Sequence, residues 1–476
     1  MTEKKTKIIA TLGPATLTPK MVENLVAAGA DVFRLNFSHG SREQHGGSID
    51  MIRAVSRKTG VPCGILADLQ GPKIRTGRTA GDAPVILREG SDVTLTVKPA
   101  VCTDTLISVD YRRLAHEIKA GQRVLINDGA VALTVQAVNR ANGTVRCRVL
   151  NTGAYSSRKG VNFPDVRLSI PSMTAKDRAD LAFILGRDVD YVALSFVRSG
   201  KDVAALRRLV THAGSAVRLI AKIEKPEAAR DIGPILAQSD GIMVARGDLG
   251  VETSPEQVPI VQKNLIAAAN AAGRQVIVAT QMLESMIKNP LPTRAESTDV
   301  ANAILDGADC LMLSGETSVG DYPQQAVAMM AKIARATEAS AYVSTVHADL
   351  ALRPGYPPHS VCEAAATASA DLGGAPVVVF TMSGDTAFYL SKIRNRSRIF
   401  AFSPDPRVVT RLSLAWNVTA MHLPMTSDLA RLQERAERML LGRKLVRRGD
   451  LVVVVSGAAT VRGATSSMRV KRVGQE

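Results

Sequence analysis

Long hydrophobic runs are missing from this sequence of 476 residues. A membrane-spanning helix needs ~20 consecutive apolar residues, and the longest apolar runs here, such as 451–455, have the length of a buried strand. The first residues include several lysines but only a very short apolar stretch, which is not the pattern of a signal peptide. We therefore expect no association with a membrane.

Cysteines are few, odd in number and scattered, at positions 63, 102, 147, 310 and 362. No Cys-x-x-Cys pair occurs, so neither a disulfide framework nor a zinc cluster is supported. Isolated cysteines of this kind are typical of a reducing compartment. We therefore expect a cytoplasmic protein.

Acidic residues are in deficit and aromatic residues are scarce. Lysine and arginine total 60 against 44 aspartate and glutamate residues, a formal net charge of +16. Such an excess attracts anions, including nucleic acids and small phosphates. Aromatic side chains make up only 4% of the chain, so a base-stacking surface is poorly supplied. We expect small phosphorylated ligands and no nucleic acid; the nucleic-acid alternative predicts binding with a steep salt dependence.

Short apolar runs alternate with amphipathic segments along most of the chain. Runs without polar alternation are typical of parallel strands buried on both faces. The eight runs are 7–12, 31–37, 63–68, 190–196, 218–223, 240–246, 275–280 and 309–314, and helical segments between them include 18–28, 43–58, 199–212, 256–272 and 296–306. Eight strand–helix units predict an α/β fold, a (β/α)₈ barrel formed by residues 1–70 and 171–342.

Two intervals depart from this rhythm. Apolar and polar residues alternate within 71–170, where Asp-Gly at 128–129 and Asn-Gly at 142–143 are hairpin turn signals. This predicts an inserted antiparallel β domain, placed as a lid over the C-terminal face of the barrel. After a Pro-rich stretch at 351–358, apolar runs recur with helices between them, which predicts an open α/β domain over 343–476.

Polar residues follow each of the last seven barrel strands, where this fold places active sites. They are Arg34, Asn36, Ser38, Asp68, Ser195, Lys222, Glu224, Arg246, Asp248, Thr280, Gln281, Ser314 and Glu316. Glu224 and Asp248, from adjacent strands, form a pair of oxygen ligands suited to Mg²⁺ or Mn²⁺. A structural ion pair between Lys222 and Glu224 is the alternative. Residues 245–248 also form a turn whose backbone N–H groups suit a carboxylate or phosphate.

At these residues the chain resembles the pyruvate kinase family over nearly its whole length. The segments that carry the resemblance are 6–16, 29–40, 71–77, 159–164, 221–226, 241–252, 279–286 and 293–323. The resemblance implies a barrel, an inserted β lid, a C-terminal regulatory domain and a homotetramer. It also implies transfer of the phosphoryl group of phosphoenolpyruvate to ADP, giving pyruvate and ATP in glycolysis.

The resemblance assigns roles to individual residues. Glu224 and Asp248 are implied Mg²⁺ ligands, while Lys222 and Arg34 contact the transferring phosphoryl group. Ala245, Arg246, Gly247 and Asp248 form the substrate segment, in which the N–H groups of Arg246 and Gly247 hold the substrate carboxylate. Thr280 lies beside the enolate carbon and Ser314 supports a water there. Asn36, His39, Arg75 and Lys159 are implied nucleotide contacts, and Asp128 is a lid residue that closes on the site.

One position departs from the family pattern. Members that require K⁺ resemble Asp-Thr-Lys-Gly-Pro-Glu where this chain has Asp68-Leu69-Gln70-Gly71-Pro72-Lys73. The other residues of the potassium site, Asn36, Ser38 and Asp68, are retained. We therefore expect the ammonium of Lys73 to act as an internal cation beside them and K⁺ not to be required. Alternatively, Lys73 points away at the lid hinge as a solvated lysine.

The third domain contains Thr381-Met382-Ser383-Gly384-Asp385-Thr386 between a strand and a helix. Its hydroxyls, Gly384 and the helix N–H groups suit an anion, and the resemblance implies a phosphorylated effector here, a sugar phosphate or nucleotide, with Arg462 assisting. A simple helix cap is the alternative. For the whole chain, a Mg²⁺-dependent barrel aldolase acting on pyruvate enolate is the alternative enzyme, and it would not need a lid or a nucleotide.

Overall fold

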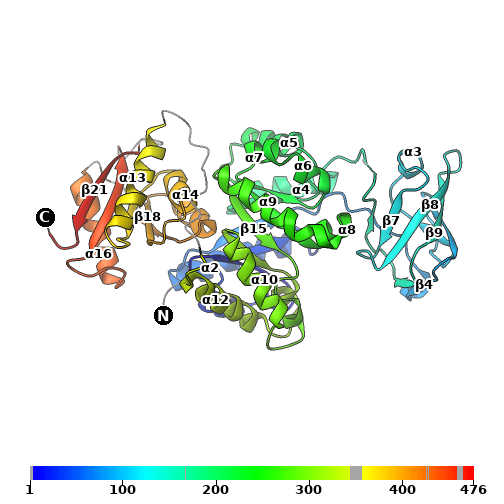
Figure 1. Ribbon diagram of the computed structural model, residues 1–476, viewed down its shortest axis with the longest axis horizontal. Coiled ribbons are helices and arrows are strands. Elements are labelled where there is room, and N and C mark those ends of the chain that lie inside the picture. Colours follow the sequence, from blue (N-terminus) through cyan, green and yellow to red (C-terminus); the bar gives the residue numbers. More distant parts are fainter. Residues whose placement is uncertain are drawn as a thin grey trace.

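The computed structural model describes residues 4–166, 168–343, 356–424, 426, 428–457 and 465–475. Three bodies follow one another along the longest axis (Figure 1). The barrel lies in the middle, the inserted β domain at one end and the C-terminal domain at the other. In the described part of the chain, no helix has both the length and the apolarity needed to cross a membrane.

The central body is a closed parallel barrel with the strand order β1-β16-β15-β14-β13-β12-β3-β2, which confirms the predicted fold class. Its strands are β1 (Lys7–Thr11), β2 (Val32–Asn36), β3 (Gly64–Asp68), β12 (Tyr191–Leu194), β13 (Arg218–Ile223), β14 (Gly241–Ala245), β15 (Gln275–Ala279) and β16 (Cys310–Leu313). Each of the eight predicted runs contains one of these strands. Continuous apolar sequence is needed because both faces of every strand are buried.

Helices surround the barrel and begin where the sequence supplies caps. They are α1 (Pro19–Ala28), α2 (Arg42–Thr59), α4 (Ala175–Leu185), α5 (Gly200–His212), α6 (Pro226–Arg230), α7 (Ile232–Gln238), α8 (Arg246–Glu252), α9 (Val258–Ala271), α10 (Arg294–Leu305), α11 (Gly315–Ser318) and α12 (Pro323–Ala339). Short 3₁₀ turns lie at Pro255–Gln257 and Glu284–Ile287. Capping boxes at Ser41, Thr174 and Thr293 satisfy free N–H groups at the starts of α2, α4 and α10.

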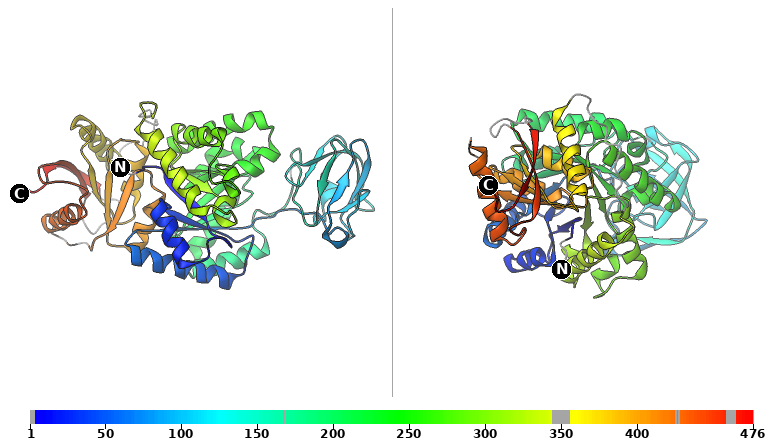
Figure 2. Two further views of the ribbon diagram at one scale, coloured as in Figure 1. Left: turned by 90° about the horizontal axis from the view of Figure 1, so that it is seen from below. Right: turned by 60° about the vertical axis from the view of Figure 1, so that its left-hand side comes forward.

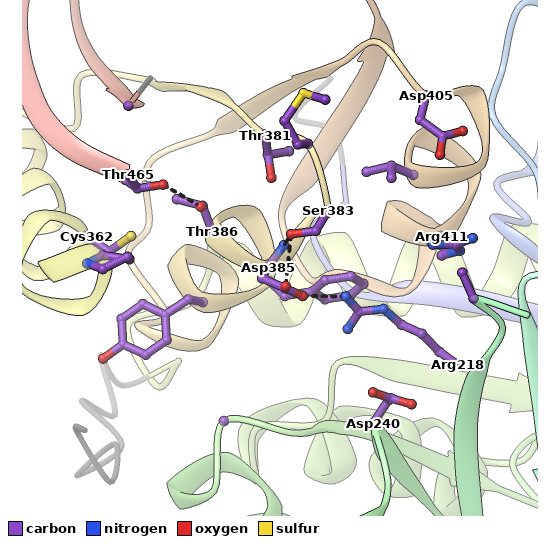
Figure 3. A pocket seen from close by; sticks show the side chains of 18 of the residues that line it. Arg218, Asp240, Cys362, Thr381, Ser383, Asp385, Thr386, Asp405, Arg411 and Thr465 are labelled. Carbon is purple, nitrogen blue, oxygen red and sulfur yellow. Dashed lines mark hydrogen bonds and ion pairs between the residues drawn. The ribbon is translucent and has the colours of Figure 1, made fainter. Parts of the chain in front are cut away.

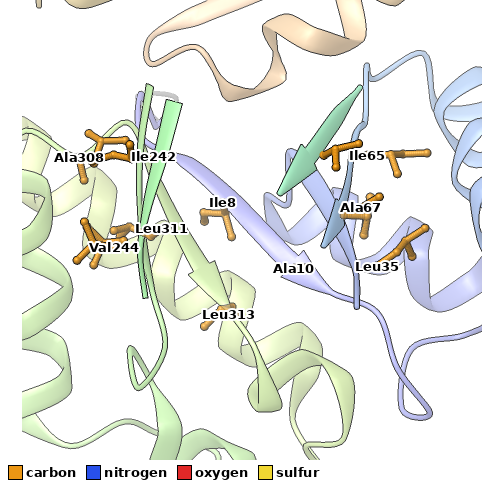
Figure 4. Packing of buried hydrophobic residues seen from close by; sticks show 14 of the residues in the cluster. Ile8, Ala10, Leu35, Ile65, Ala67, Ile242, Val244, Ala308, Leu311 and Leu313 are labelled. Carbon is orange, nitrogen blue, oxygen red and sulfur yellow. The ribbon is translucent and has the colours of Figure 1, made fainter. Parts of the chain in front are cut away.

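Alternate residues of the barrel strands belong to two different cores. Ile8, Ala10, Leu35, Ile65 and Ala67 belong to the cluster between strands and helices (Figure 4). Their neighbours in sequence, including Ile9 and Leu66, belong to a separate cluster inside the barrel. Successive side chains of a strand point to opposite faces, so one apolar run contributes to both cores.

The inserted domain leaves the barrel after β3 and returns before α4. It contains β4 (Val85–Leu87), β5 (Asp92–Thr96), β6 (Leu106–Ser108), α3 (Leu114–Glu117), β7 (Arg123–Ile126), β8 (Val131–Asn139), β9 (Thr144–Val149), β10 (Gly153–Tyr155) and β11 (Val161–Asn162), with a 3₁₀ turn at Ala80–Asp82. The predicted turns at 128–129 and 142–143 join β7 to β8 and β8 to β9, which pair antiparallel. Two thin stretches connect this domain to the barrel (Figure 2).

The C-terminal domain has a five-stranded sheet of order β19-β18-β17-β20-β21. Its elements are α13 (Pro357–Asp371), β17 (Val377–Phe380), α14 (Asp385–Lys392), β18 (Ile399–Ser403), α15 (Pro406–Arg411), a 3₁₀ turn (Leu412–Leu414), β19 (Val418–His422), α16 (Leu429–Gly442), β20 (Leu451–Gly457) and β21 (Thr465–Arg472). Most of the Pro-rich linker predicted at 351–358 lies outside the described residues.

The C-terminal domain is joined to the N-terminal end of the barrel by buried contacts. Leu414 is fully buried within the cluster inside the barrel. Lys392, also fully buried, donates hydrogen bonds to Asn270 and Asp309 of the barrel. An apolar side chain inside the barrel and a buried ion pair beside it resist rigid separation of the two domains.

Candidate active site

Four charged side chains form a continuous chain at the C-terminal mouth of the barrel. Arg34 Nε donates to Asp68 Oδ2 at 2.7 Å. Lys222 Nζ lies 3.3 Å from Asp68 Oδ1 and 2.9 Å from Glu224 Oε1. Arg34 lies within β2, Asp68 ends β3, and Lys222 and Glu224 lie at the end of β13 and directly after it. The parallel pairing of β2 with β3, β3 with β12 and β12 with β13 brings their carboxyl ends to one side. The structure therefore brings together four of the residues that the sequence singled out.

Mutual attraction offsets the cost of burying these charges. Burial raises the pKa of Asp68, but Lys222 and Arg34 outweigh it, so its pKa lies below the usual value. Burial likewise lowers the pKa of Lys222, and the carboxylates of Asp68 and Glu224 overcome this and raise it. Lys222 therefore carries positive charge at the mouth at neutral pH.

Glu224 and Asp248 have the properties of a divalent cation site. Burial raises the pKa of Glu224, the carboxylate of Asp248 raises it further, and Lys222 opposes both effects. Phe196 N–H donates to Glu224 Oε2 at 2.7 Å and fixes that carboxylate in place. Mg²⁺ is commonly held by one or two carboxylates together with substrate oxygens, so a cation between these two anions would relieve their repulsion. The residues fit Mg²⁺ or Mn²⁺.

The substrate segment is fixed through the side chain of Arg246. Its guanidinium donates to Asp299 Oδ1 and to the carbonyl oxygen of Thr280, each at 2.7 Å. Gly247 N–H donates to Thr280 Oγ1, also at 2.7 Å, and Ala245 is the buried last residue of β14. Arg246 thus uses its side chain to hold the backbone of this segment in place, while the N–H group of Gly247, which is expected to hold the substrate carboxylate, donates to Thr280 in this structure.

Two consecutive residues at the end of β15 have a strained backbone. Thr280 and Gln281 have φ values of 72° and 54°, and a β-branched residue with positive φ is a genuine outlier. Such conformations persist only where surrounding contacts impose them, and they cluster at functional sites. Ser314 nearby in the fold, at the end of β16, has a buried hydroxyl without a hydrogen-bond partner among the described residues. An unpaired buried hydroxyl is consistent with the expected contact to a water.

The expected nucleotide contacts come from two parts of the structure. Arg75 and Gly160 form an antiparallel bridge, which places Arg75 and Lys159 on adjoining stretches at the base of the lid. The guanidinium of Arg75 donates to the carbonyl of Arg158 at 3.0 Å. Asn36 Oδ1 accepts from Ser38 N–H at 3.1 Å, and exposed His39 follows in the same loop. Leu69 continues β3, and its carbonyl accepts the Ser195 hydroxyl at 2.7 Å.

Lys73 does not occupy the position expected for an internal cation. Its ammonium lies 3.4 Å from Asp248 Oδ1 and 4.0 Å from Asp128 Oδ1. Within the described residues, no ion pair or hydrogen bond joins it to Asn36, Ser38 or Asp68. The physical reason is that the Asp68 carboxylate is already paired with Arg34 and Lys222, whereas Asp248 has no other cation within ion-pair distance among those residues.

A buried carboxylate that the sequence did not single out joins the lid to the site. Glu252 ends α8 and accepts hydrogen bonds from Asn162 at 2.7 Å and from Lys225 at 2.5 Å. Asn162 belongs to strand β11 of the inserted domain, and Lys225 directly follows Glu224, the residue expected to hold a metal. A glutamate at the end of a helix is common, so the sequence gives no reason to single out Glu252. Its contact with Asn162, which is 90 positions away in the chain, is known only from the structure.

The predicted effector loop forms a compact turn before α14. Thr381 Oγ1 accepts from Gly384 N–H at 2.9 Å, and Gly384 has a φ of 88°, which glycine adopts without strain. Thr386 and Thr465 hydroxyls lie 2.8 Å apart, while Ser383 donates to Asp385 at 2.9 Å. Arg462, the predicted assisting residue, lies outside the described residues.

Comparisons with known proteins agree with this arrangement. Residues 3–327 match the family "Pyruvate kinase, barrel domain", and residues 359–471 match "Pyruvate kinase, alpha/beta domain". The chain is 45% identical to pyruvate kinase 2 of Synechocystis over 475 residues, covering 99% of this chain and 79% of that protein. It is 43% identical to pyruvate kinase of Mycobacterium tuberculosis, covering 99% of both chains.

The fold is also found among solved structures. A crystal structure of a pyruvate kinase from Cryptosporidium parvum superposes with a TM-score of 0.93 at 34% identity, covering 99% of this chain and 96% of that one. Similarity therefore extends through the barrel, the inserted domain and the C-terminal domain. The chain is an enzyme of the pyruvate kinase family.

Proposed function

We propose that this enzyme transfers the phosphoryl group of phosphoenolpyruvate to ADP in glycolysis, giving pyruvate and ATP, and that it depends on Mg²⁺ or Mn²⁺. The observation that carries the proposal is the buried cluster of Arg34, Asp68, Lys222 and Glu224 beside Asp248. It offers two fixed cations to a phosphoryl group and two carboxylates to a metal. Phosphoryl transfer depends mainly on such positioning and charge neutralisation.

Each group at the mouth has a definite task in this reaction. Lys222 and Arg34 bind the phosphoryl oxygens, and their pairing with Asp68 fixes both cations before substrate arrives. The N–H groups of Arg246 and Gly247 hold the substrate carboxylate, and Gly247 N–H exchanges its present acceptor, Thr280 Oγ1, for a carboxylate oxygen when substrate binds. A divalent cation held by Glu224 and Asp248 supplies charge that stabilises the enolate and phosphoryl oxygens.

Proton delivery completes the reaction. After the C–O–P bridge breaks on the phosphorus side, the enolate of pyruvate needs one proton at its terminal carbon. Thr280, held by Gly247 N–H and the carbonyl of Ala279, lies on the side of the site from which that proton comes. The unpaired hydroxyl of Ser314 orients a water that connects this position to solvent.

The remaining features complete the proposal. Lys159, Arg75, Asn36 and His39 contact the nucleotide as the lid, with Asp128, closes. Lys73 pairs with Asp248 and not with Asp68, but its ammonium still adds positive charge at the mouth, and the proposal that K⁺ is not required rests on that charge. The loop from Thr381 to Thr386 binds a phosphorylated effector, and the enzyme is a cytoplasmic homotetramer without nucleic-acid or membrane partners.

A coupled assay for pyruvate tests the central proposal. Turnover should require phosphoenolpyruvate, ADP and a divalent cation together, and excess EDTA should abolish it. Glu224→Gln and Asp248→Asn should raise the Mg²⁺ concentration for half-maximal rate steeply, because hard cations need anionic oxygen ligands. Glu89→Gln, an exposed lid glutamate, is the control. Pyruvate formation from phosphoenolpyruvate without ADP would mean transfer of the phosphoryl group to water and would contradict the proposed acceptor. No turnover of phosphoenolpyruvate with or without ADP would favour the aldolase alternative, and full activity in EDTA would remove the metal from the mechanism.

A further inference from the structure

An ion pair connects the proposed effector loop directly to a catalytic strand of the barrel. The guanidinium of Arg218 donates to Asp385 Oδ1 at 2.5 Å and lies 4.3 Å from the centre of the Phe388 ring (Figure 3). Asp385 begins α14 and also accepts the hydroxyl hydrogen of Ser383. Arg218 is the first residue of β13, the strand that ends at Lys222 and Glu224.

This pair borders a large cavity between the barrel and the C-terminal domain. The cavity has a volume of about 730 Å³. Its charged walls are Arg207, Arg218, Asp240 and Arg274 from the barrel, and Asp385, Asp405, Arg407 and Arg411 from the C-terminal domain. Five arginines therefore face three aspartates, so the space attracts anions. Thr381, Ser383 and Thr386 line the same cavity, which places the proposed effector loop within reach of Arg218.

A second carboxylate lies on the barrel side of Arg218. Asp240 raises the pKa of Arg218 through space, as Asp385 does, and outweighs burial together with it. Asp240 Oδ2 pairs with Arg207 at 2.8 Å and accepts Leu219 N–H at 2.8 Å. The guanidinium of Arg218 is therefore paired with Asp385 of the C-terminal domain, and the carboxylate of Asp240, which is paired with Arg207, attracts it from the barrel side.

Arg218 and Asp240 lie at the start of the two strands that are followed by the implied metal ligands. Arg218 begins β13, and Asp240 directly precedes β14. The two strands pair in register from Ile220 with Gly241 to Ile223 with Val244. At their far ends they present Glu224 and Asp248. The backbone hydrogen bonds of this pair of strands therefore connect the region of Arg218 to the residues implied as metal ligands.

We propose that Arg218 couples the effector loop to the active site. An anionic group bound at Thr381–Thr386 displaces Asp385 from the Arg218 guanidinium and becomes its partner, because the anion and the Asp385 carboxylate repel each other. The anion then bridges the two domains, and Arg218 is a positioning residue for Lys222 and Glu224 rather than a catalytic one. This inference rests on the proposed effector function of the loop.

Substrate saturation with and without an anion tests the coupling. The probes are glucose 6-phosphate, ribose 5-phosphate and AMP, each added to the full-length enzyme while phosphoenolpyruvate is varied. Allosteric coupling is typically fivefold or more, and we expect a probe that raises the melting temperature of the wild type to shift its half-saturation concentration by about that factor. In Arg218→Met the same probe should shift it by less than about twofold, while saturating probe still raises the melting temperature.

Two further variants separate a specific contact from general electrostatics. Arg207→Met removes a neighbouring cavity arginine that pairs with Asp240, and it should keep most of the response. Asp385→Asn should move the half-saturation concentration without probe toward the value that the wild type shows with probe. Both results are expected only if the contact between Arg218 and Asp385, and not the total charge of the cavity, controls the response.

The possible failures are distinguishable. If no probe changes the melting temperature or the saturation curve of the wild type, the effector loop is assigned wrongly and the coupling is overturned with it. If the wild type responds and Arg218→Met responds equally, the loop is an effector site but Arg218 does not couple it. An equal loss of response in Arg207→Met and Arg218→Met would also overturn the proposal, because net charge would then explain it.

Discussion

Replacing Lys73 with glutamate is expected to make this enzyme depend on potassium. The ammonium of Lys73 lies 3.4 Å from Asp248 Oδ1. Two unit charges at that distance interact by ~5 kcal/mol at an effective dielectric constant of ~20, and by ~1 kcal/mol in water. The Lys73 and Asp248 side chains are 27% and 26% exposed, so the interaction lies between these limits.

The substitution Lys73→Glu replaces this attraction with a repulsion. Even ~1 kcal/mol corresponds to about a fivefold change in an equilibrium constant, and reversal of the sign adds a comparable penalty. We therefore expect kcat/KM to fall at least about tenfold when tetramethylammonium is the only monovalent cation, because that ion is too large for a site among side chains. Addition of KCl should restore most of the loss in the variant and change the wild type little.

The control is Lys119→Glu, which makes the same charge change at an exposed lysine of the lid. It should match the wild type in both buffers. A wild-type enzyme that is almost inactive in tetramethylammonium and is activated strongly by KCl would refute the reasoning. The contact with Asp248 would then be only an ion pair across the hinge, and the charge of Lys73 would not replace a free cation.

Three other substitutions or treatments give sharp expectations. Lys222→Met should lower kcat about 100- to 1,000-fold, since loss of one preorganised charge costs ~3–4 kcal/mol in the transition state. It should also lower the melting temperature, because the buried carboxylates of Asp68 and Glu224 lose a cation, so kcat is measured at a temperature where circular dichroism shows the variant folded. Lys201→Met, at an exposed site, should be silent, and near-normal kcat for Lys222→Met would exclude Lys222 from the chemistry. Lys392→Met should destabilise the folded state by ~3 kcal/mol, because it removes one partner of the buried Asp309. Burial lowers the pKa of Lys392 from 10.5 to about 8. The folded state therefore binds this proton less tightly than the unfolded chain does. As the pH rises from about 8 to 10.5, the contribution of Lys392 to the free energy of unfolding increases. The difference in melting temperature between wild type and Lys392→Met, followed by calorimetry from pH 7 to 9.5, should therefore widen with pH; a difference that narrows would contradict the pKa shift. All five cysteines are buried, so a thiol reagent at pH 8 should label none rapidly in the native enzyme and all five in denaturant, and fast labelling of the native enzyme would contradict the packing.

The effector loop illustrates how far local sequence can predict function. Its hydroxyls and glycine indicated a turn before a helix, and Gly384 does adopt a positive φ there. The same residues could not show that Asp385 faces an arginine 167 positions earlier in the chain. Sequence patterns predict local conformation, whereas a contact between domains depends on how the two folded domains pack against each other.

The sequence alone determined the barrel and the residues at its mouth. Eight apolar runs can be buried on both faces only in a parallel sheet covered by helices, and the strand ends of such a barrel converge on one side. That logic is sufficient to bring Arg34, Asp68, Lys222 and Glu224 together, because register and strand direction follow from the fold class.

Only the tertiary structure determines which charged side chains pair with one another. Lys73 pairs with Asp248 rather than Asp68, Glu252 joins strand β11 to Lys225 beside Glu224, and Leu414 from the last domain packs inside the barrel. Each of these choices depends on competition among groups far apart in the chain, where burial and distance fix the free energy of every pairing. The pattern of apolar residues does not predict pairings between residues far apart in the chain, so these contacts are known only from the folded structure.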